Sequence, residues 1–335
     1  MRINNKHTHL IIAGSILLLL IWKADIAAAG ALEGVQLCTQ VIIPSLFPFF
    51  FITAYMIPLL TTVKFPGIRQ LCKSIYIPSG CEGLLMLGLI GGYPVGAQAI
   101  NSAFKTGNLS KEQAYRLMGF CSNAGPSFIF GVTASLFPSK TTPWLLWFIH
   151  IVSALLTALI IPKPHEKSAG QVHYSESTIL QAFQQSLRIT ASVCGWVILF
   201  KVVLAIFFSA IRPQNGIYQA IITGILELSG GCIALSKISN LSLRFILCSA
   251  LLSFGGVCVF MQTASVAAGL GTGLYLPGKL IQTLLSTLLS LLIVLVQDIS
   301  ALSGTFVAII YLTAIPCIIM LRYVCRKKLW KLCYV

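Results

Sequence analysis

The sequence predicts an all-α, polytopic membrane protein with an inverted repeat, made of about eight transmembrane helices and two re-entrant hairpins. Of its 335 residues, 57% are hydrophobic and only 9% are charged, whereas roughly a quarter are charged in soluble domains. Long uncharged runs, most of them near the ~18–20 residues that cross a bilayer, cover 34–63, 83–104, 117–139, 141–162, 245–278, 280–297 and 299–321. This composition excludes a soluble enzyme, a nucleic-acid-binding protein and a secreted disulfide scaffold.

Apolar runs and helix breakers divide the chain into membrane segments. The segments are expected near 10–29, 35–60, 79–104, 116–136, 143–161, 186–211, 217–236, 244–268, 277–297 and 302–321. The first segment follows two basic residues and lacks a small-residue cleavage site, so an uncleaved anchor helix is predicted within 1–34. The remaining chain is predicted to comprise a first repeat at 35–161, a polar cytoplasmic linker at 162–185, a second repeat at 186–321 and a basic cytoplasmic tail at 322–335.

The positions of lysine and arginine distinguish two topologies, because these residues gather in short cytoplasmic loops. If all the segments cross, 13 of the 23 basic residues are cytoplasmic, nine are outside and Lys201 lies within a span. If 79–104 and 217–236 instead enter and leave on one side, 17 are cytoplasmic, Lys279 among them, and five are outside. Those five are Lys23, Lys140, Arg212, Lys237 and Arg244. The hairpin topology fits the charges better, and it places both termini in the cytoplasm.

Paired helix breaks support the inverted repeat. The hairpins break at 91–96 (GGYPVG) and 229–231 (SGG), and each is followed by an arginine-led helix with its own break, at Gly125-Pro126 or Gly255-Gly256. The stretch 88–100 also resembles 224–235, although glycine-rich membrane helices resemble one another by chance and the same residues permit close packing. Free backbone polar groups survive in a membrane only where they line a cavity. The paired breaks therefore predict one shared site at mid-membrane depth.

The half-helices that follow the two hairpin tips are predicted to bind an anion. Free backbone N–H groups and the positive end of the helix dipole favour a carboxylate or a phosphate at such a position. The residues expected to contribute are Gly96, Ala97, Gln98, Gly230 and Gly231.

Glu227 is the one acidic residue well inside an apolar segment, and an ionisable group there is costly enough to indicate function. It is predicted to bind the solute and to take part in ion coupling, with Lys201 as its counter-ion. A purely structural ion pair between these two residues and a neutral, protonated acid remain alternatives. Lys201 also fits a supporting role in which its ammonium snorkels towards the interface.

Polar side chains near the other breaks complete the predicted site. Ser122 and Asn123 precede the Gly125-Pro126 break, and Gln262 follows the Gly255-Gly256 break. Asn123 and Gln262 are predicted to contact the solute, and Ser122 the coupling ion. Each of these side chains alone also fits an ordinary hydrogen bond between helices.

No cofactor and no catalytic activity are predicted. A nucleophile elbow, a P-loop, a zinc-protease motif and paired acidic residues are all missing from the sequence, so an enzyme is not expected. The 11 cysteines form no C-x-x-C pair, and we expect them to be small core residues rather than metal ligands or disulfides.

Several motifs resemble a known family. They are 43–50 (IPSLFPFF), 87–98 (LGLIGGYPVGAQ), 109–114 (LSKEQA) and 120–129 (FCSNAGPSFI). They look like the sporulation integral membrane protein YlbJ family, over roughly 30–325. That family carries the Gate domain, also called the nucleoside recognition domain, of concentrative nucleoside transporters and ferrous iron transport protein B. The resemblance implies a role in endospore formation and transport of dipicolinate, a small aromatic dicarboxylate, across the outer forespore membrane.

The nucleoside transporters of this type place Gln-Thr-Glu in the first hairpin tip, where this chain has Gly-Tyr-Pro-Val-Gly-Ala-Gln. By position, only Glu227 and Asn123 match their pattern. A nucleoside transporter of the Gate-domain type is therefore kept as an alternative.

The expected function is a multi-pass transporter in the cell membrane that moves a small anionic solute, coupled to H⁺ or Na⁺. The expected partners are the solute, the coupling ion and the lipid bilayer, but not nucleic acid, and a homo-oligomer is left open. Two further alternatives are a channel and a non-transporting scaffold for spore assembly that works through the basic loops 105–116 and 162–188.

Overall fold

The computed structural model describes residues 5–62, 66–164, 178–211 and 215–298, and every regular element within these ranges is a helix. Five stretches in them are long and apolar enough to cross a membrane: Ala24–Met56, Thr142–Ile160, Ile179–Ile211, Leu241–Val266 and Tyr275–Val296. The predicted class, an all-α polytopic membrane protein, is thereby confirmed. The predicted segment 302–321 and the basic tail 322–335 lie outside the described residues.

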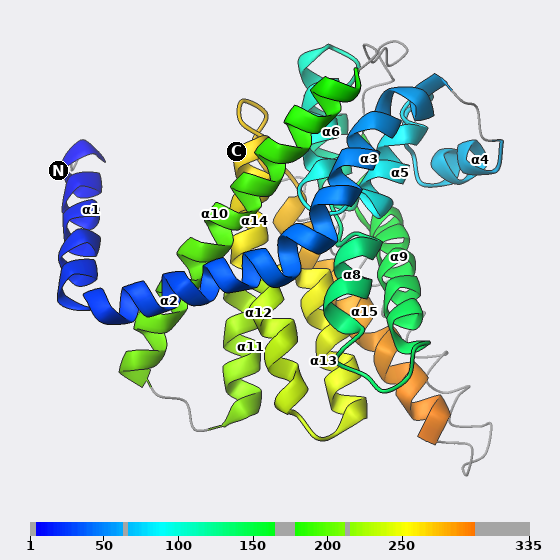
Figure 1. The fold of residues 1–335 in the computed structure, drawn as a ribbon. Helices are drawn as coiled ribbons and strands as arrows, with labels where there is room; N and C mark the ends of the chain where they lie inside the picture. The colour runs from blue at the N-terminus through cyan, green and yellow to red at the C-terminus, as the bar shows by residue number, and fades with distance from the viewer. Residues whose placement is uncertain (1–4, 63–65, 165–177, 212–214, 299–335) are drawn as a thin grey trace.

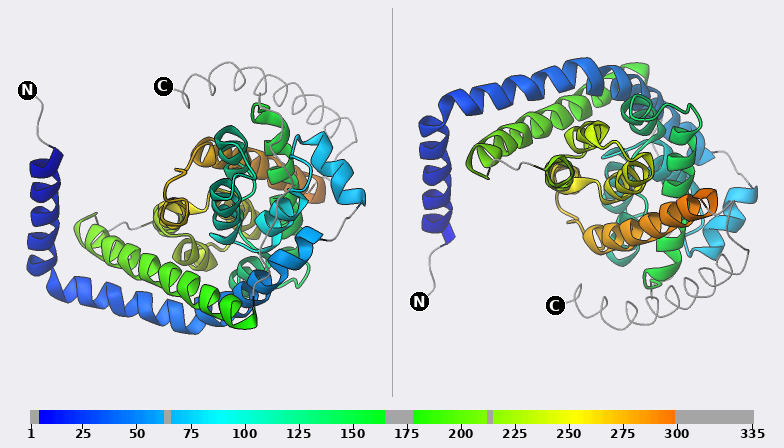
Figure 2. Two further views of the ribbon diagram at one scale, coloured as in Figure 1. Left: turned by 90° about the horizontal axis from the view of Figure 1, so that it is seen from above. Right: turned by 90° about the horizontal axis from the view of Figure 1, so that it is seen from below.

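The N-terminal helices form an L-shaped arm around the rest of the protein (Figure 2). Helix α1 (Asn5–Trp22) ends at a bend, and α2 (Ala24–Leu37) continues through a π-helical turn (Cys38–Ile42) into α3 (Ile43–Thr62). The π turn directly precedes Pro44, which has no N–H to donate to the preceding turn, and such turns relieve the missing bond.

A helix boundary was predicted between 29 and 35, and this prediction was wrong. Gly30 and Gly34 do not break α2 but let it approach α10 (Ile179–Ile211) closely. A Cβ atom on Gly34 would lie 2.8 Å from the Cα of Ile198. These glycines therefore serve packing between two long helices.

The elements between α3 and α15 occur twice in the same order. The first set comprises α3, a hairpin of α5 (Glu82–Ile90) and α6 (Val95–Lys105), a broken helix of α7 (Lys111–Met118) and α8 (Pro126–Thr133), and α9 (Thr142–Ile160). The second comprises α10, a hairpin of α11 (Gly216–Leu226) and α12 (Leu228–Ala234), a broken helix of α13 (Leu241–Phe254) and α14 (Gly256–Val266), and α15 (Tyr275–Asp298). Short helices α4 (Pro66–Ser74) and η2 (Leu235–Lys237) are additions.

The two hairpins lie on opposite sides of the fold. Figure 1 shows α5 and α6 in the upper part and α11 and α12 in the lower part. The contacts between the two sets of helices match in the same way. Helix α6 of the first set packs against α14 of the second, α12 of the second set packs against α8 of the first, and α9 packs against α15. This arrangement is the one expected of an inverted repeat.

Local sequence explains where the broken helices begin and end. Ser110 and Gln113 form a capping box at the start of α7, and the side chain of Asn240 accepts a hydrogen bond from the backbone N–H of Leu243 at the start of α13. Gly255 ends α13 with a φ of +82°, a left-handed conformation that a side chain disfavours. The first hairpin breaks at 91–94, as predicted.

Two arginines that were counted as loop charges tie the broken helices to their neighbours. Arg116 is 2% exposed and donates to the carbonyls of Ala158 and Pro162 at 2.7 and 2.9 Å. Arg244 donates to the carbonyls of Leu136 and Ile238. Both guanidinium groups satisfy backbone carbonyls beyond helix ends, which is a structural role.

Candidate functional site

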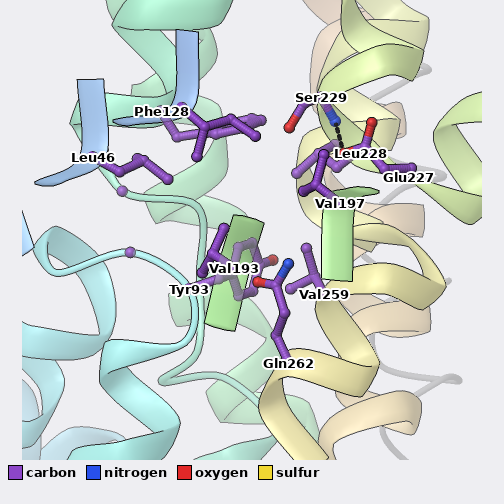
Figure 3. Close-up of a pocket in the computed structure, with 13 residues that line it drawn as sticks. Leu46, Tyr93, Phe128, Val193, Val197, Glu227, Leu228, Ser229, Val259 and Gln262 are labelled. Carbon is purple, nitrogen blue, oxygen red and sulfur yellow. Dashed lines mark hydrogen bonds between the residues drawn. The ribbon is translucent and has the colours of Figure 1, made fainter. Parts of the chain in front are cut away.

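Three of the four helix breaks line one small cavity (Figure 3). Its lining comes from both hairpin tips, from the break before α8, and from α14, α10 and the π turn. The lining includes four polar side chains and two glycines, namely Tyr93, Glu227, Ser229 and Gln262, with Gly92 and Gly125. The volume is about 30 Å³, roughly room for one or two water molecules. In this conformation the site is closed around a space too small for an organic solute.

Glu227 lies at the tip of the second hairpin, between α11 and α12. Its backbone is extended, and its carboxylate accepts hydrogen bonds from the backbone N–H groups of Ser229 at 2.8 Å and Gly230 at 2.6 Å. The side chain is 1% exposed. The hairpin therefore breaks at Glu227, two residues before the predicted SGG break, because Glu227 itself caps α12.

This cap changes the predicted role of the second tip. The N–H groups that start α12 already bind the Glu227 carboxylate, so they do not face the cavity as free donors for a second anion. Gly231 serves packing, since a Cβ atom there would lie 2.1 Å from the Cα of Gly224. The described geometry does not support anion capture by Gly230 and Gly231.

The residues predicted at the first tip also lie away from the cavity. A Cβ atom on Gly96 would lie 2.0 Å from the carbonyl oxygen of Cys121, so Gly96 permits close contact with the broken helix. Ala97 is fully buried, and Gln98 is half-buried with an unpartnered Oε1 atom. Tyr93 and Gly92, on the turn before α6, line the cavity instead.

Lys201 pairs with Glu33 and not with Glu227. Its Nζ atom lies 2.5 Å from a Glu33 carboxylate oxygen. Gly230 sits between the two charged groups, because a Cβ atom there would be 2.9 Å from Glu227 Oε2 and 3.0 Å from Lys201 Nζ. The predicted direct ion pair with Glu227 is therefore wrong, although Lys201 does lie beside the Glu227 cap.

A second and larger cavity reaches the same tip from the other side of α12. Its volume is about 390 Å³, and it is framed by α2, α10, α11 and α12 down to Lys237. Polar side chains in its wall include those of Glu33, Gln36, Gln40, Lys201, Gln219, Thr223 and Lys237. The second hairpin thus separates a roomy polar cavity from the closed central one.

Of Asn123 and Gln262, only Gln262 lines the central cavity. Gln262 donates to Cys258 Sγ at 3.3 Å, and Figure 3 shows it reaching into the same space as Tyr93. Asn123 is fully buried behind the cavity wall, where its amide nitrogen donates to the carbonyls of Gly88 and Phe120. The neighbouring Ser122 is fully buried and its hydroxyl has no hydrogen-bond partner.

Lys279 belongs to the same buried group and was missed. It was assigned to a cytoplasmic loop, but it lies in α15 and is 0% exposed, so that assignment was wrong. Its Nζ atom donates to Asn123 Oδ1 at 3.1 Å and to Gln282 Oε1 at 2.7 Å. A sequence signal exists, because the polar residues at 279, 282, 286 and 290 follow helical spacing. In α15 all four are fully buried.

Among the described residues no cluster of histidine, cysteine and carboxylate side chains has the arrangement of a metal site. The eight cysteines within them are free, and seven are buried.

The chain is similar to the sporulation integral membrane protein YlbJ of Bacillus subtilis (strain 168). The two are 24% identical over 280 residues, which cover 70% of this chain and 68% of the relative. No family model matches the sequence, and no solved structure matches it. The similarity supports the family suggested by the motifs and agrees with the membrane character of the fold, while the Gate domain stays a prediction.

Proposed function

We propose that the protein is an integral membrane transporter of a small anionic solute such as dipicolinate, and that it acts in sporulation. The convergence of both hairpin tips and the break before α8 on one cavity carries this proposal. Backbone N–H and C=O groups that lack helical hydrogen bonds are tolerated within the membrane where they surround a solute or ion site. The name of the B. subtilis relative, a sporulation integral membrane protein, supports the link to sporulation, and the outer forespore membrane is the proposed location.

A carrier cycle accounts for the two unequal cavities. In this cycle the larger cavity would admit a small solute to the side of the Glu227 tip that faces away from the central cavity, which has room for only one or two water molecules. Movement of the second hairpin would join them, and movement of the first hairpin would open the central cavity to the opposite side. This sequence of openings is alternating access about a fixed site.

Glu227 is the proposed link between solute and coupling ion. Its carboxylate holds two backbone N–H groups of α12 and lies next to Lys201. Binding of H⁺ or Na⁺ at this carboxylate would weaken its hold on the N–H groups and so loosen the hairpin tip. The ion and the movement of the hairpin are thereby coupled through one side chain.

The scaffold alternative receives less support from the contacts. One of the basic residues in the loop 105–116, Arg116, is buried against Ala158 and Pro162 and is not offered to a partner protein.

Uptake of labelled pyridine-2,6-dicarboxylate into proteoliposomes tests the proposal. We expect saturable uptake by the wild-type protein and its loss in Glu227→Gln and Asn123→Ala. Asp25→Asn, which changes an exposed carboxylate, and Asn108→Ala serve as matched controls with unchanged uptake. Unchanged uptake in both site variants would contradict the site assignment. Uptake of nucleosides but not of the dicarboxylate would favour the Gate-type alternative. Flux that does not saturate with solute concentration would indicate a channel.

A further inference from the structure

Lys279 is a buried basic residue with neutral hydrogen-bond partners. An ammonium group has three N–H donors, and two of them serve Asn123 and Gln282. The side chain is fully enclosed in the second turn of α15. The start of a helix carries positive partial charge, so the site of this ammonium is electropositive from two sources.

No carboxylate neutralises this charge within the described part of the chain. The single ion pair found there joins Lys201 to Glu33. The centroids of the Tyr93 and Tyr275 rings lie 5.0 and 5.8 Å from Nζ, and cation–π contacts of this kind are weak. Removing an unpaired ion from water costs more than these contacts return, so the rings offset only part of the cost.

Lys279 lies directly behind the wall of the central cavity. Tyr93 forms that wall, with Lys279 over its ring. The Tyr93 hydroxyl is itself buried without a hydrogen-bond partner, and the residue belongs to the turn between α5 and α6. Movement of this turn, which the proposed cycle requires, would uncover the ammonium to whatever occupies the cavity.

We propose that Lys279 is the recognition residue for a carboxylate of the transported solute, and that Asn123 positions its ammonium. The third N–H donor of Lys279 and the Tyr93 hydroxyl would bind the carboxylate, whose charge balances the buried cation. This inference rests on the proposed function for the place of the solute, and it adds the residue that recognises the solute and the group recognised, a carboxylate, which a neutral nucleoside lacks.

Binding to the wild-type protein gives the first test. Thermal unfolding of detergent-purified protein is followed with pyridine-2,6-dicarboxylate and with the neutral pyridine-2,6-dicarboxamide. We expect the dicarboxylate to raise the midpoint and the diamide to leave it unchanged. Equal shifts with both compounds, or no shift with the dicarboxylate, would overturn the role of Lys279. A dicarboxylate shift without uptake into proteoliposomes would instead overturn transport and leave the inference standing.

Two substitutions give the second test. Lys279→Gln should lower dicarboxylate uptake at subsaturating concentration at least tenfold and abolish the thermal shift, while Lys279→Arg keeps the charge and should retain part of both. A structural role alone would lower the stability of Lys279→Gln but leave the dicarboxylate-induced shift in place. If Lys279→Gln fails to fold, Lys279→Arg takes its place: we expect a smaller dicarboxylate-induced shift than in the wild type, and a shift equal to that of the wild type would contradict the proposal.

Discussion

The backbone N–H of Gly230 donates a 2.6 Å hydrogen bond to the carboxylate of Glu227, so the acidic residue of the second hairpin caps the helix that follows it. An ionisable group inside a membrane segment is expensive, and here it makes a local contact that fixes the hairpin tip. The Glu227 side chain thus belongs to the candidate site and also holds the hairpin tip in its fold.

Glu227→Ala should therefore lower stability as well as activity. It removes both hydrogen bonds to the start of α12, and loss of a helix N-cap costs about 0.5–2 kcal/mol. Glu227→Gln keeps one acceptor oxygen and should lie between alanine and wild type in thermal unfolding. Asp25→Asn is the matched control. An alanine variant as stable as the wild type would show that the cap does not hold the tip.

Alanine at the close-packed glycines should prevent folding. The new Cβ atom would lie 2.0 Å from a backbone oxygen at Gly96 and 2.1 Å from a backbone carbon at Gly231, and backbone cannot yield as a flexible side chain does. Gly195→Ala on α10 meets nothing within 4 Å and should raise helix stability by about 1 kcal/mol. Yield and monodispersity of the purified proteins measure the difference. Well-folded Gly96→Ala would contradict the close contact.

The difference between the two cavities should appear in thiol labelling. A cysteine at Gln219, in the cavity of about 390 Å³, should react with a charged, membrane-impermeant thiol reagent, whereas one at Val259, in the cavity of about 30 Å³, should not. The wild-type protein measures background from the native cysteines. Equal labelling at both positions would show that the central cavity opens freely to water.

Topology can be settled by labelling at three loop positions. The hairpin topology predicts that cysteines at Ser110 and Gly170 are labelled from the cytoplasmic side and one at Asn240 from the opposite side. Ten simple crossings would place all three outside. Labelling of intact cells before and after permeabilisation distinguishes these patterns.

The sequence foretold the helical class, the four breaks and the burial of Glu227, because glycine, proline and charge leave strong local signals in an apolar chain. It did not foretell which groups meet. Lys201 was matched with the nearest acid in an apolar segment, yet Glu33 lies closer in space. Lys279 was counted with the cytoplasmic charges although the predicted segment 277–297 contains it, and only its helical spacing with Gln282 and Ser286 indicates a buried face.

The glycines expose a second reason for error. At Gly30, Gly34, Gly96 and Gly231 the missing side chain admits another helix, whereas at Gly255 it permits a left-handed turn. Because both uses require glycine, a helix break and a close helix contact can be told apart only when the neighbouring helix is known.

The size of the central cavity has a consequence for the membrane that holds the protein. A wide aqueous pore needs a far larger opening than the space for one or two water molecules found here. In this conformation the central cavity is therefore too narrow to form part of such a pore, and ions with their full hydration shells do not fit in it.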